Sequence, residues 1–366
     1  MNDFNSIILY INVFIISVFF LLFSKLFLNK SILYNRFYVF ICLLIPSILA
    51  GLRYKVGTDY EAYVLIYNKV NGLSYLEFLQ TNNYEIGFFT LEKIAMWTGD
   101  VKILFFLSSF ITLFFIYLAL KQHINIFPIT LGYMLYIFTI FPDSLNAVRQ
   151  QLAIAIVVYS LKYIFDKKLY KFLLFTLLAS TFHITALIVL PFYFLFHYSK
   201  NRLDTKDKYK TFLRGIMLLC ITLFIVSYGY FLDLIVTLSS IDRFGEYSQE
   251  IGTGNNREVV LGFFILLFIL SMKNRLIHID HRNKLYIYFL IVGFILSLAS
   301  IWNPIISRMA SYFDISLIFL VPAIVANLET RLGRYLGGLL VCFYSITYFV
   351  FVYYILGHSE IIPYGI

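Results

Sequence analysis

Two arginines stand out because each lies inside an apolar stretch. Arg149 occurs in SLNAVRQQLAIAI and Arg308 in SRMASYF, one to two turns into segments long enough to cross a membrane. Burying a guanidinium at that depth costs on the order of 3 kcal/mol and usually marks a functional site. The planar donors of arginine fit the oxygens of a phosphate group. We therefore expect both arginines to bind a phosphorylated substrate, although Arg149 could instead pair with Asp143 and Arg308 with Asp314.

Further titratable side chains are expected at the same ends of the helices. Arg53 would add a third cation, unless it is an interfacial residue that extends its charge to water. Asp59 follows the turn at Gly57 in VGTDY, and its carboxylate is a candidate general base or a helix cap. Glu85, in NNYEIG, is a second candidate of that type or a solvated loop acid. His183 is either a buried structural histidine or the base that we slightly favour, since a neutral imidazole is poised near pH 7.

The composition identifies the elements that must position these residues. The chain of 366 residues is 61% hydrophobic and only 13% charged, with a mean hydropathy of +0.83. In a soluble protein roughly a quarter of the residues are charged and cover its surface, which is more than this chain contains. The net charge of +9 would suggest nucleic acid in a soluble protein, but here it must be divided between two sides of a membrane.

Apolar blocks of membrane-spanning length follow one another along the chain. The expected spans are 7–23, 37–52, 101–120, 127–141, 147–165, 172–198, 212–232, 259–272, 285–301, 305–328 and 336–356. Backbone groups in lipid must be satisfied within the segment, so these spans are helices. The expected fold is a single all-α polytopic domain over residues 1–366, with about 10–12 transmembrane helices. The first span lacks a signal-peptide cleavage site and is expected to be retained.

Basic residues in the short connections set the expected orientation. They cluster at 25–36, 166–171, 200–214, 273–284 and 331–334. The positive-inside rule places these connections in the cytoplasm and both termini outside. Segment 172–198 has basic connections on both sides, so one crossing would invert every later loop. We therefore expect a short helical hairpin, or a re-entrant pair, whose tip lies at 180–185.

Two external segments are long enough to have structure of their own. Residues 53–100 contain Tyr60, Tyr63 and Tyr67 at helical spacing with acids on the other side, which indicates a helix lying at the membrane interface. Residues 233–258 are polar, acidic and contain glycine, and are expected to form a mobile loop.

Signatures of several other chemistries are absent from the sequence. It contains no P-loop, HExxH or GxSxG motif and no Cys/His pair at metal-site spacing, so we expect neither a metal nor a cofactor. No cytoplasmic segment is long enough for a nucleotide-sugar domain. These absences favour a lipid-presented substrate on the outer face.

Four motifs in chain order resemble the EpsG-like branch of the O-antigen and exopolysaccharide polymerase (Wzy) family. They are GLRYKVGTDYEAYVLIY, NAVRQQLAIAI, FHITALIVLPFYF and SRMASYF, and the resemblance covers roughly residues 35–325. It implies a glycosyltransferase of the GT-C-like kind in the bacterial inner membrane, with its active site facing outside. Such enzymes transfer a growing glycan from undecaprenyl pyrophosphate to the non-reducing end of a lipid-linked oligosaccharide repeat unit. The external loop 233–258 is shorter than in better-known members.

The resemblance also implies roles for individual residues. The positions that match its motifs are Arg53, Gly57, Asp59, Tyr60, Arg149, Gln150, His183 and Arg308. In this mechanism Arg149 and Arg308, assisted by Arg53, stabilise the leaving pyrophosphate in place of a metal. His183 or Asp59 deprotonates the acceptor hydroxyl, which attacks the anomeric carbon with inversion. Secondary substrate contacts are expected from Tyr60, Gln150 and Glu85.

Two other functions fit parts of the same pattern. A flippase or transporter of lipid-linked oligosaccharides would also use buried arginines, but it should have pseudo-symmetric halves with paired broken helices. A single-sugar GT-C enzyme would use a polyprenyl-phosphate sugar. The expected partners are lipid-linked oligosaccharides, membrane lipid and a chain-length regulator protein, with no nucleic acid.

Overall fold

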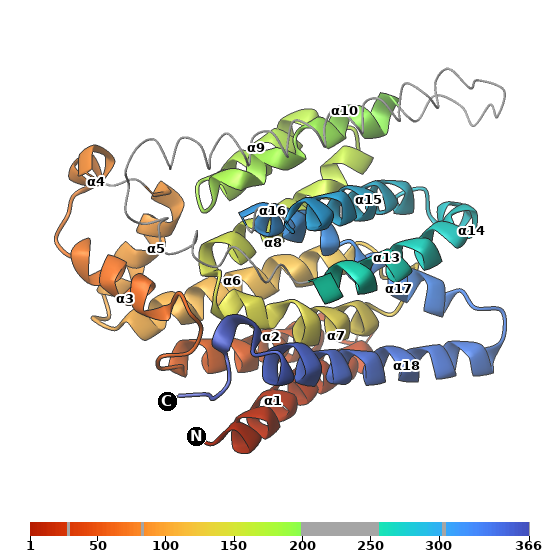
Figure 1. Ribbon diagram of the computed structural model, residues 1–366, viewed down its shortest axis with the longest axis horizontal. Coiled ribbons are helices and arrows are strands. Elements are labelled where there is room, and N and C mark those ends of the chain that lie inside the picture. The colour runs from red at the N-terminus through yellow and green to blue at the C-terminus, as the bar shows by residue number, and fades with distance from the viewer. Residues whose placement is uncertain (28–29, 82–83, 199–255, 302–304, 366) are drawn as a thin grey trace. The chain divides into compact units, whose positions relative to one another are not determined.

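The computed structural model describes residues 1–27, 30–81, 84–198, 256–301 and 305–365. The expected span 212–232 lies outside the described residues, as does the expected loop 233–258 up to residue 255. Every regular element in the described part is helical, which confirms the all-α expectation. Figure 1 shows the order of these helices along the chain.

Several of these helices are long and apolar enough to cross a membrane, so the chain is a multi-pass membrane protein. The described residues contain five such segments: Asp3–Phe27, Ile32–Leu52, Val101–Lys121, Ile306–Ala326 and Arg331–Ile355. A sixth candidate is a pair, Val259–Ser271 and Lys273–Ile279, that bends by 62°.

Other expected spans are shorter helices in the structure. The apolar helices of intermediate length are Ile129–Thr139, Leu169–Ser180, Ile184–His197 and Asn283–Ala299. A helix such as Ile129–Thr139 is only about 17 Å long, roughly half of a bilayer core. The described residues therefore contain fewer full-length spans than the sequence predicts.

The chain forms two compact units. The first consists of 1–163, 170–186 and 324–366, and the second of 164–169 and 187–323. In the first unit, α1 (Asp3–Ser24) packs on α2 (Ile32–Leu52), which packs on α6 (Val101–Lys121). α7 (Ile129–Thr139) packs on both α1 and α18 (Arg331–Phe349).

Small and polar residues allow these helices to approach one another. A Cβ atom on Gly51 of α2 would lie 2.9 Å from the Cβ of Phe106 on α6, so only glycine fits there. The buried hydroxyl of Ser17 lies 2.7 Å from the Cys42 carbonyl and 2.8 Å from the Tyr133 hydroxyl. One side chain thus connects α1, α2 and α7, as hydrogen bonds between membrane helices commonly do.

Both described ends of the chain lie at the same end of the first unit (Figure 1). The Met1 ammonium group donates to the Tyr364 carbonyl at 3.2 Å, and the Tyr10 hydroxyl donates to the Ile361 carbonyl at 3.0 Å. The Tyr364 hydroxyl donates to the carbonyl of Leu49, near the end of α2. The C-terminal residues are therefore part of the helix bundle.

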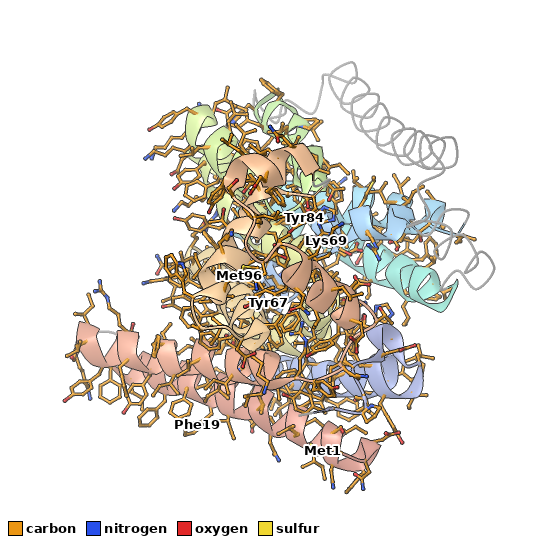
Figure 2. All side chains as sticks on the ribbon, turned by 90° about the vertical axis from the view of Figure 1, so that its left-hand side faces the viewer. Met1, Phe19, Tyr67, Lys69, Tyr84 and Met96 are labelled. Carbon is orange, nitrogen blue, oxygen red and sulfur yellow. The ribbon has the colours of Figure 1, made fainter. Side chains whose placement is uncertain are left out.

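Three short helices connect α2 to α6. They are α3 (Tyr60–Lys69), α4 (Tyr75–Thr81) and α5 (Ile86–Met96), and we call them the α3–α5 segment. Val70, Phe78 and Phe89 form a small buried core within it. Figure 2 faces this segment and labels Tyr67, Lys69, Tyr84 and Met96 from it. The predicted tyrosine helix is present as α3, and its Tyr60, Tyr63 and Tyr67 face is buried in the protein.

The predicted hairpin segment is interrupted where its tip is expected. α9 (Leu169–Ser180) ends before the turn 181–183, and a 3-10 helix, Ile184–Val189, and α10 (Pro191–Tyr198) follow it. The residues before Leu187 belong to the first unit and those after Ala186 to the second. The return of the second arm therefore stays a prediction.

The second unit contains α13 (Asn256–Ser271), α14 (Lys273–Ile279), α15 (Asn283–Ala299) and α16 (Ile305–Asp314). α15 and α16 approach closely because Gly293 has no side chain: a Cβ atom there would lie 2.3 Å from a carboxylate oxygen of Asp314. The Tyr286 ring stacks on Phe319 of α17 (Leu317–Ala326) at 4.5 Å.

Candidate functional site

Arg149 lies at the start of α8 (Val148–Phe165) and is held by residues of the α3–α5 segment. Its Nη1 atom donates to Glu85 Oε2 at 2.9 Å, in a pair whose side chains are 27% and 17% exposed. Its guanidinium carbon lies 5.7 Å from the centroid of the Tyr84 ring and 5.9 Å from that of Phe88. Arg149 is thus held by a charge-assisted hydrogen bond and two aromatic faces.

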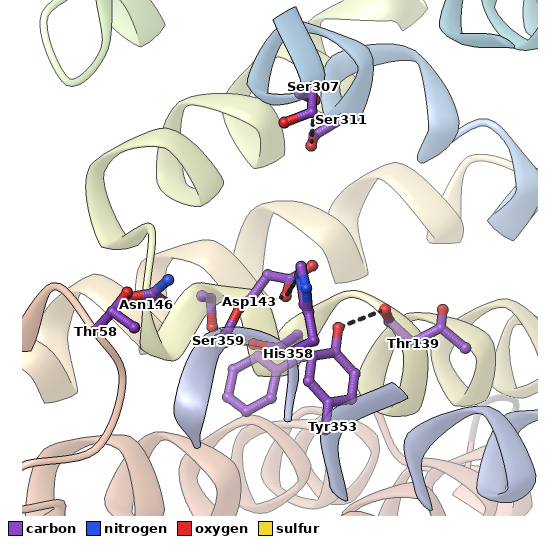
Figure 3. Close-up of polar contacts among 11 residues, drawn as sticks. Thr58, Thr139, Asp143, Asn146, Ser307, Ser311, Tyr353, His358 and Ser359 are labelled. Atoms are coloured by element: carbon purple, nitrogen blue, oxygen red, sulfur yellow. Dashed lines mark hydrogen bonds and ion pairs between the residues drawn. The ribbon is translucent and has the colours of Figure 1, made fainter. Parts of the chain in front are cut away.

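Asp143, the acid that could have paired with Arg149, has other partners. Its carboxylate oxygen Oδ1 lies 3.4 Å from His358 Nε2 and accepts a hydrogen bond from the Ser359 hydroxyl at 3.2 Å (Figure 3). His358 and Ser359 belong to the C-terminal residues, to which the sequence analysis assigned no role. Their signal is a short polar run, GHSE, after a long apolar block.

Glu85 connects Arg149 to the turn that carries His183. Its second oxygen, Oε1, accepts a hydrogen bond from the Ile184 backbone N–H at 3.0 Å. Beside it, the Gly87 N–H donates to the Thr181 carbonyl at 2.7 Å, and a Cβ atom on Gly87 would lie 2.3 Å from the Thr181 hydroxyl. These contacts hold the start of α5 against residues 181–184. Only glycine fits at position 87, because any side chain there would meet Thr181.

His183 has a defined ring orientation. Its Nδ1 atom lies 2.6 Å from the Thr185 hydroxyl oxygen. When Nδ1 carries the proton and donates to this oxygen, Nε2 has the lone pair that a general base needs. The Thr185 hydroxyl can accept from Nδ1–H or donate to Nδ1, so this contact fixes the ring orientation in either tautomer.

The loop that carries Asp59 is fixed from both sides. Gly57 has a φ of +90°, and a Cβ atom there would lie 2.8 Å from the Leu145 carbonyl oxygen, so the turn requires glycine. Asn146 Oδ1 accepts the Asp59 backbone N–H at 2.8 Å. It also accepts the Thr58 hydroxyl at 2.9 Å, and Figure 3 shows these two side chains side by side. The Asp59 carboxylate forms no cap hydrogen bond, although the residue occupies the N-cap position of α3. Asn146 thus takes over part of the capping and leaves the carboxylate for other contacts.

Arg53 is buried at the end of α2, with only 1% of its surface exposed. Its Nη1 atom donates to the Ala50 carbonyl at 2.9 Å, and its guanidinium carbon lies 4.0 Å above the centroid of the Phe105 ring. Its Nε and Nη2 atoms have no hydrogen-bond partner among the described residues. Burial lowers the pKa of Arg53 to about 10, so the group remains a cation at neutral pH. Arg53 does not extend to water, and its charge is directed into the protein.

The rings that support the two arginines share a neighbour. Tyr63 packs on Phe105, which supports Arg53, with ring centroids 6.3 Å apart. It also packs on Phe88, which supports Arg149, at 5.6 Å. Burial raises the pKa of the Tyr63 hydroxyl, and the nearby Arg149 guanidinium opposes this shift. Tyr63 therefore connects the surroundings of both arginines, a role that its spacing in the sequence did not indicate.

A buried acid that the sequence analysis did not single out lies behind Arg149. Glu92 of α5 is fully buried and accepts a hydrogen bond from the Tyr84 hydroxyl at 2.5 Å. Desolvation raises the pKa of Glu92 to about 7, against the opposing effects of Tyr84 and Arg149. Its signal was a single acid within the apolar helix IGFFTLEKIAM.

The other predicted site residues lie as follows. Tyr60 stacks on Phe105 with ring centroids 5.2 Å apart, next to Arg53. Gln150 is buried in α8. Arg308 is exposed on α16 in the second unit, so its joining the other two arginines stays a prediction. Within the described residues there is no group of three His, Cys, Asp or Glu side chains that could hold a metal ion.

The fold defines the class of protein: an all-helical, multi-pass membrane protein. A family model, described as the EpsG family, matches residues 35–366. The chain therefore belongs to the EpsG family, an exopolysaccharide and O-antigen polymerase-like family, as the four motifs indicated. The match includes the C-terminal residues that contact Asp143 and Leu49. No curated protein and no solved structure matches the chain significantly.

Proposed function

We propose that this protein is a polysaccharide polymerase that uses lipid-linked donors and acceptors. It transfers a growing glycan from undecaprenyl pyrophosphate to the non-reducing end of a lipid-linked repeat unit, on the outer face of the bacterial inner membrane. The observation that carries the proposal is that the aromatic rings supporting the buried Arg53 and the partly exposed Arg149 share one neighbour, Tyr63. Arg149 is also linked through Glu85 to the His183 turn. Two fixed guanidinium groups suit a ligand with two phosphates.

The proposed reaction exchanges one bond at the anomeric carbon for another. The acceptor hydroxyl oxygen bonds to that carbon as the bond to the pyrophosphate oxygen breaks, which inverts the configuration. The hydroxyl proton passes to His183 Nε2, or to the Asp59 carboxylate in the alternative assignment. Arg53, Arg149 and Arg308 stabilise the negative charge that the lipid pyrophosphate gains, as fixed cations do most effectively in a dry site. Tyr60 and Gln150 supply secondary contacts, and a chain-length regulator is the proposed protein partner.

The proposal is tested by polymerisation of lipid-linked repeat units with the purified protein. Arg149→Ala and Arg308→Ala should each lower kcat about 100-fold, because each removes a cation from the developing charge. A wild-type rate in either variant would exclude that arginine from the site. In cells, deletion should leave single repeat units on the lipid carrier. Loss of every surface-exposed unit would instead identify a flippase, and loss of a side-branch sugar would identify a single-sugar enzyme.

A further inference from the structure

Glu85 forms two hydrogen bonds that belong to different parts of the proposed site. We infer that Glu85 and a substrate phosphate compete for Arg149, so that phosphate binding is coupled through Glu85 to the position of the His183 turn. This inference rests on the proposed function, and it gives Glu85 the role of a positioning residue. This role differs from the secondary substrate contact predicted for Glu85 from the sequence.

Arg149 already binds one anionic side chain, that of Glu85. Its Nη1 atom donates to Glu85 Oε2, while its buried Nε atom has no hydrogen-bond partner among the described residues. A carboxylate and a phosphate present similar acceptor oxygens to a guanidinium. A phosphate that reaches Arg149 therefore meets Glu85 as a competing anion, and the two negative charges repel each other.

Glu85 also binds the backbone of the His183 turn. Its two oxygens belong to one rigid carboxylate, and Oε1 accepts the N–H of Ile184, the residue after His183. Rotation of the carboxylate away from Arg149 therefore also changes the hydrogen bond that holds this turn. The hydrogen bond from the Gly87 N–H to the Thr181 carbonyl keeps the turn next to α5 when the Glu85 carboxylate rotates. The Glu85 side chain thus connects binding of the lipid-linked glycosyl donor at Arg149 to the position of the His183 imidazole.

The Glu85 side chain can leave Arg149 without disturbing the start of α5. Glu85 occupies the N-cap position of α5 but forms no cap hydrogen bond there, so its displacement does not uncap the helix. Its side chain is 17% exposed, which means that water can reach it once it leaves Arg149. A pyrophosphate carries more than one negative charge, and this favours it over a single carboxylate.

Inorganic pyrophosphate is the probe that tests this competition in the full-length, detergent-solubilised protein. In Glu85→Gln, the amide oxygen can still accept the Ile184 N–H, but the side chain no longer competes as an anion. We expect this variant to bind pyrophosphate about tenfold more tightly than the wild type in a calorimetric titration. The matched control is Glu61→Gln, which removes an equal charge from an exposed acid of α3 paired with Lys55. Its affinity should stay at the wild-type value.

A second variant separates the coupling from the charge. Glu85→Ala removes the contacts to both Arg149 and Ile184, so it should bind pyrophosphate more tightly and yet lose most of kcat. Glu85→Gln should retain kcat and lower the KM for the lipid-linked donor. A purely structural role for Glu85 predicts weaker or unchanged pyrophosphate binding in both variants, and that result would overturn the inference.

The two hypotheses fail in different ways. If the wild type polymerises repeat units but the Glu85 variants bind pyrophosphate no more tightly, the inference is wrong and the proposed function stands. Tighter binding in a protein that polymerises nothing would end the proposed function and leave the competition between Glu85 and an anion standing.

Discussion

The guanidinium of Arg53 lies over the ring of Phe105, with its carbon 4.0 Å from the ring centroid. Arg53 is almost completely buried, and two of its nitrogen atoms have no hydrogen-bond partner among the described residues. A planar cation held in this way has its unused donors fixed in direction, which an alkylammonium group cannot reproduce.

Arg53→Lys should therefore lose activity although it keeps the charge. We expect kcat/KM for polymerisation to fall at least about tenfold, because a lysine cannot stack on Phe105 and present two further donors in one plane. Arg331→Lys, at an exposed position of α18, is the matched control and should behave as the wild type. Equal activity in the two variants would contradict a role for the guanidinium plane.

Gly57→Ala tests the turn that carries Asp59. Gly57 and Gly72 both have positive φ values, +90° and +86°, so alanine is strained at either position. Only at Gly57 would the new Cβ atom also meet the Leu145 carbonyl oxygen, at 2.8 Å, whereas nothing lies within 4 Å at Gly72. Gly57→Ala should therefore lower Tm more than Gly72→Ala, whose cost is about 1 kcal/mol. It should also reduce activity, since Asp59 moves with the turn.

Tyr63→Phe tests the residue that packs on both supporting rings. The change keeps the ring contacts with Phe88 and Phe105 but removes the hydroxyl next to Arg149. We expect pyrophosphate affinity to fall about fivefold with little change in Tm. Tyr67→Phe, one turn further along the same buried face, should leave the affinity unchanged. A loss of Tm without a loss of affinity would reduce Tyr63 to a packing residue.

Glu92→Gln tests the buried acid. Burial raises the pKa of Glu92 in the folded protein to about 7 from 4.5, so the folded state binds a proton that the unfolded state has lost between these pH values. The free energy of unfolding therefore falls as pH rises through this window, by at most about 3 kcal/mol. The glutamine has no charge to bury and can still accept the Tyr84 hydroxyl. Its Tm should match the wild type near pH 5 and exceed it at pH 8, and parallel curves would contradict this account.

Local patterns in the sequence predicted much of the secondary structure. The length of the apolar runs predicted most of the helices, and the spacing of the tyrosines predicted α3. Basic connections on both sides of segment 172–198 predicted a break, and the chain turns at 181–183. These features depend on neighbouring residues and on the side of the membrane. The lengths of individual spans were less predictable, because an apolar run such as 127–141 contains a helix of only Ile129–Thr139.

The partners of the site residues could not be predicted in the same way. Arg149 and Glu85 are 64 positions apart in the sequence, and each had a closer or more ordinary interpretation. Glu85 was expected as a solvated acid or a substrate contact, yet its pairing is set by the position of the start of α5 next to Arg149 and the 181–184 turn. Pairs such as Arg149 and Glu85 follow from tertiary packing, and no periodic pattern in the sequence predicts them.

The contacts between the two described ends of the chain have a consequence for biogenesis. The loop before Asp59 donates backbone hydrogen bonds to distant residues, since the Gly57 N–H donates to the Glu360 carbonyl and the Tyr54 N–H to the Gly365 carbonyl. The bond from Tyr10 to Ile361 spans 351 positions of the sequence. Closing such distant contacts is slow and follows the assembly of local structure. A nascent chain can thus have its early helices inserted in the bilayer well before the loop beside Arg53 acquires its native shape.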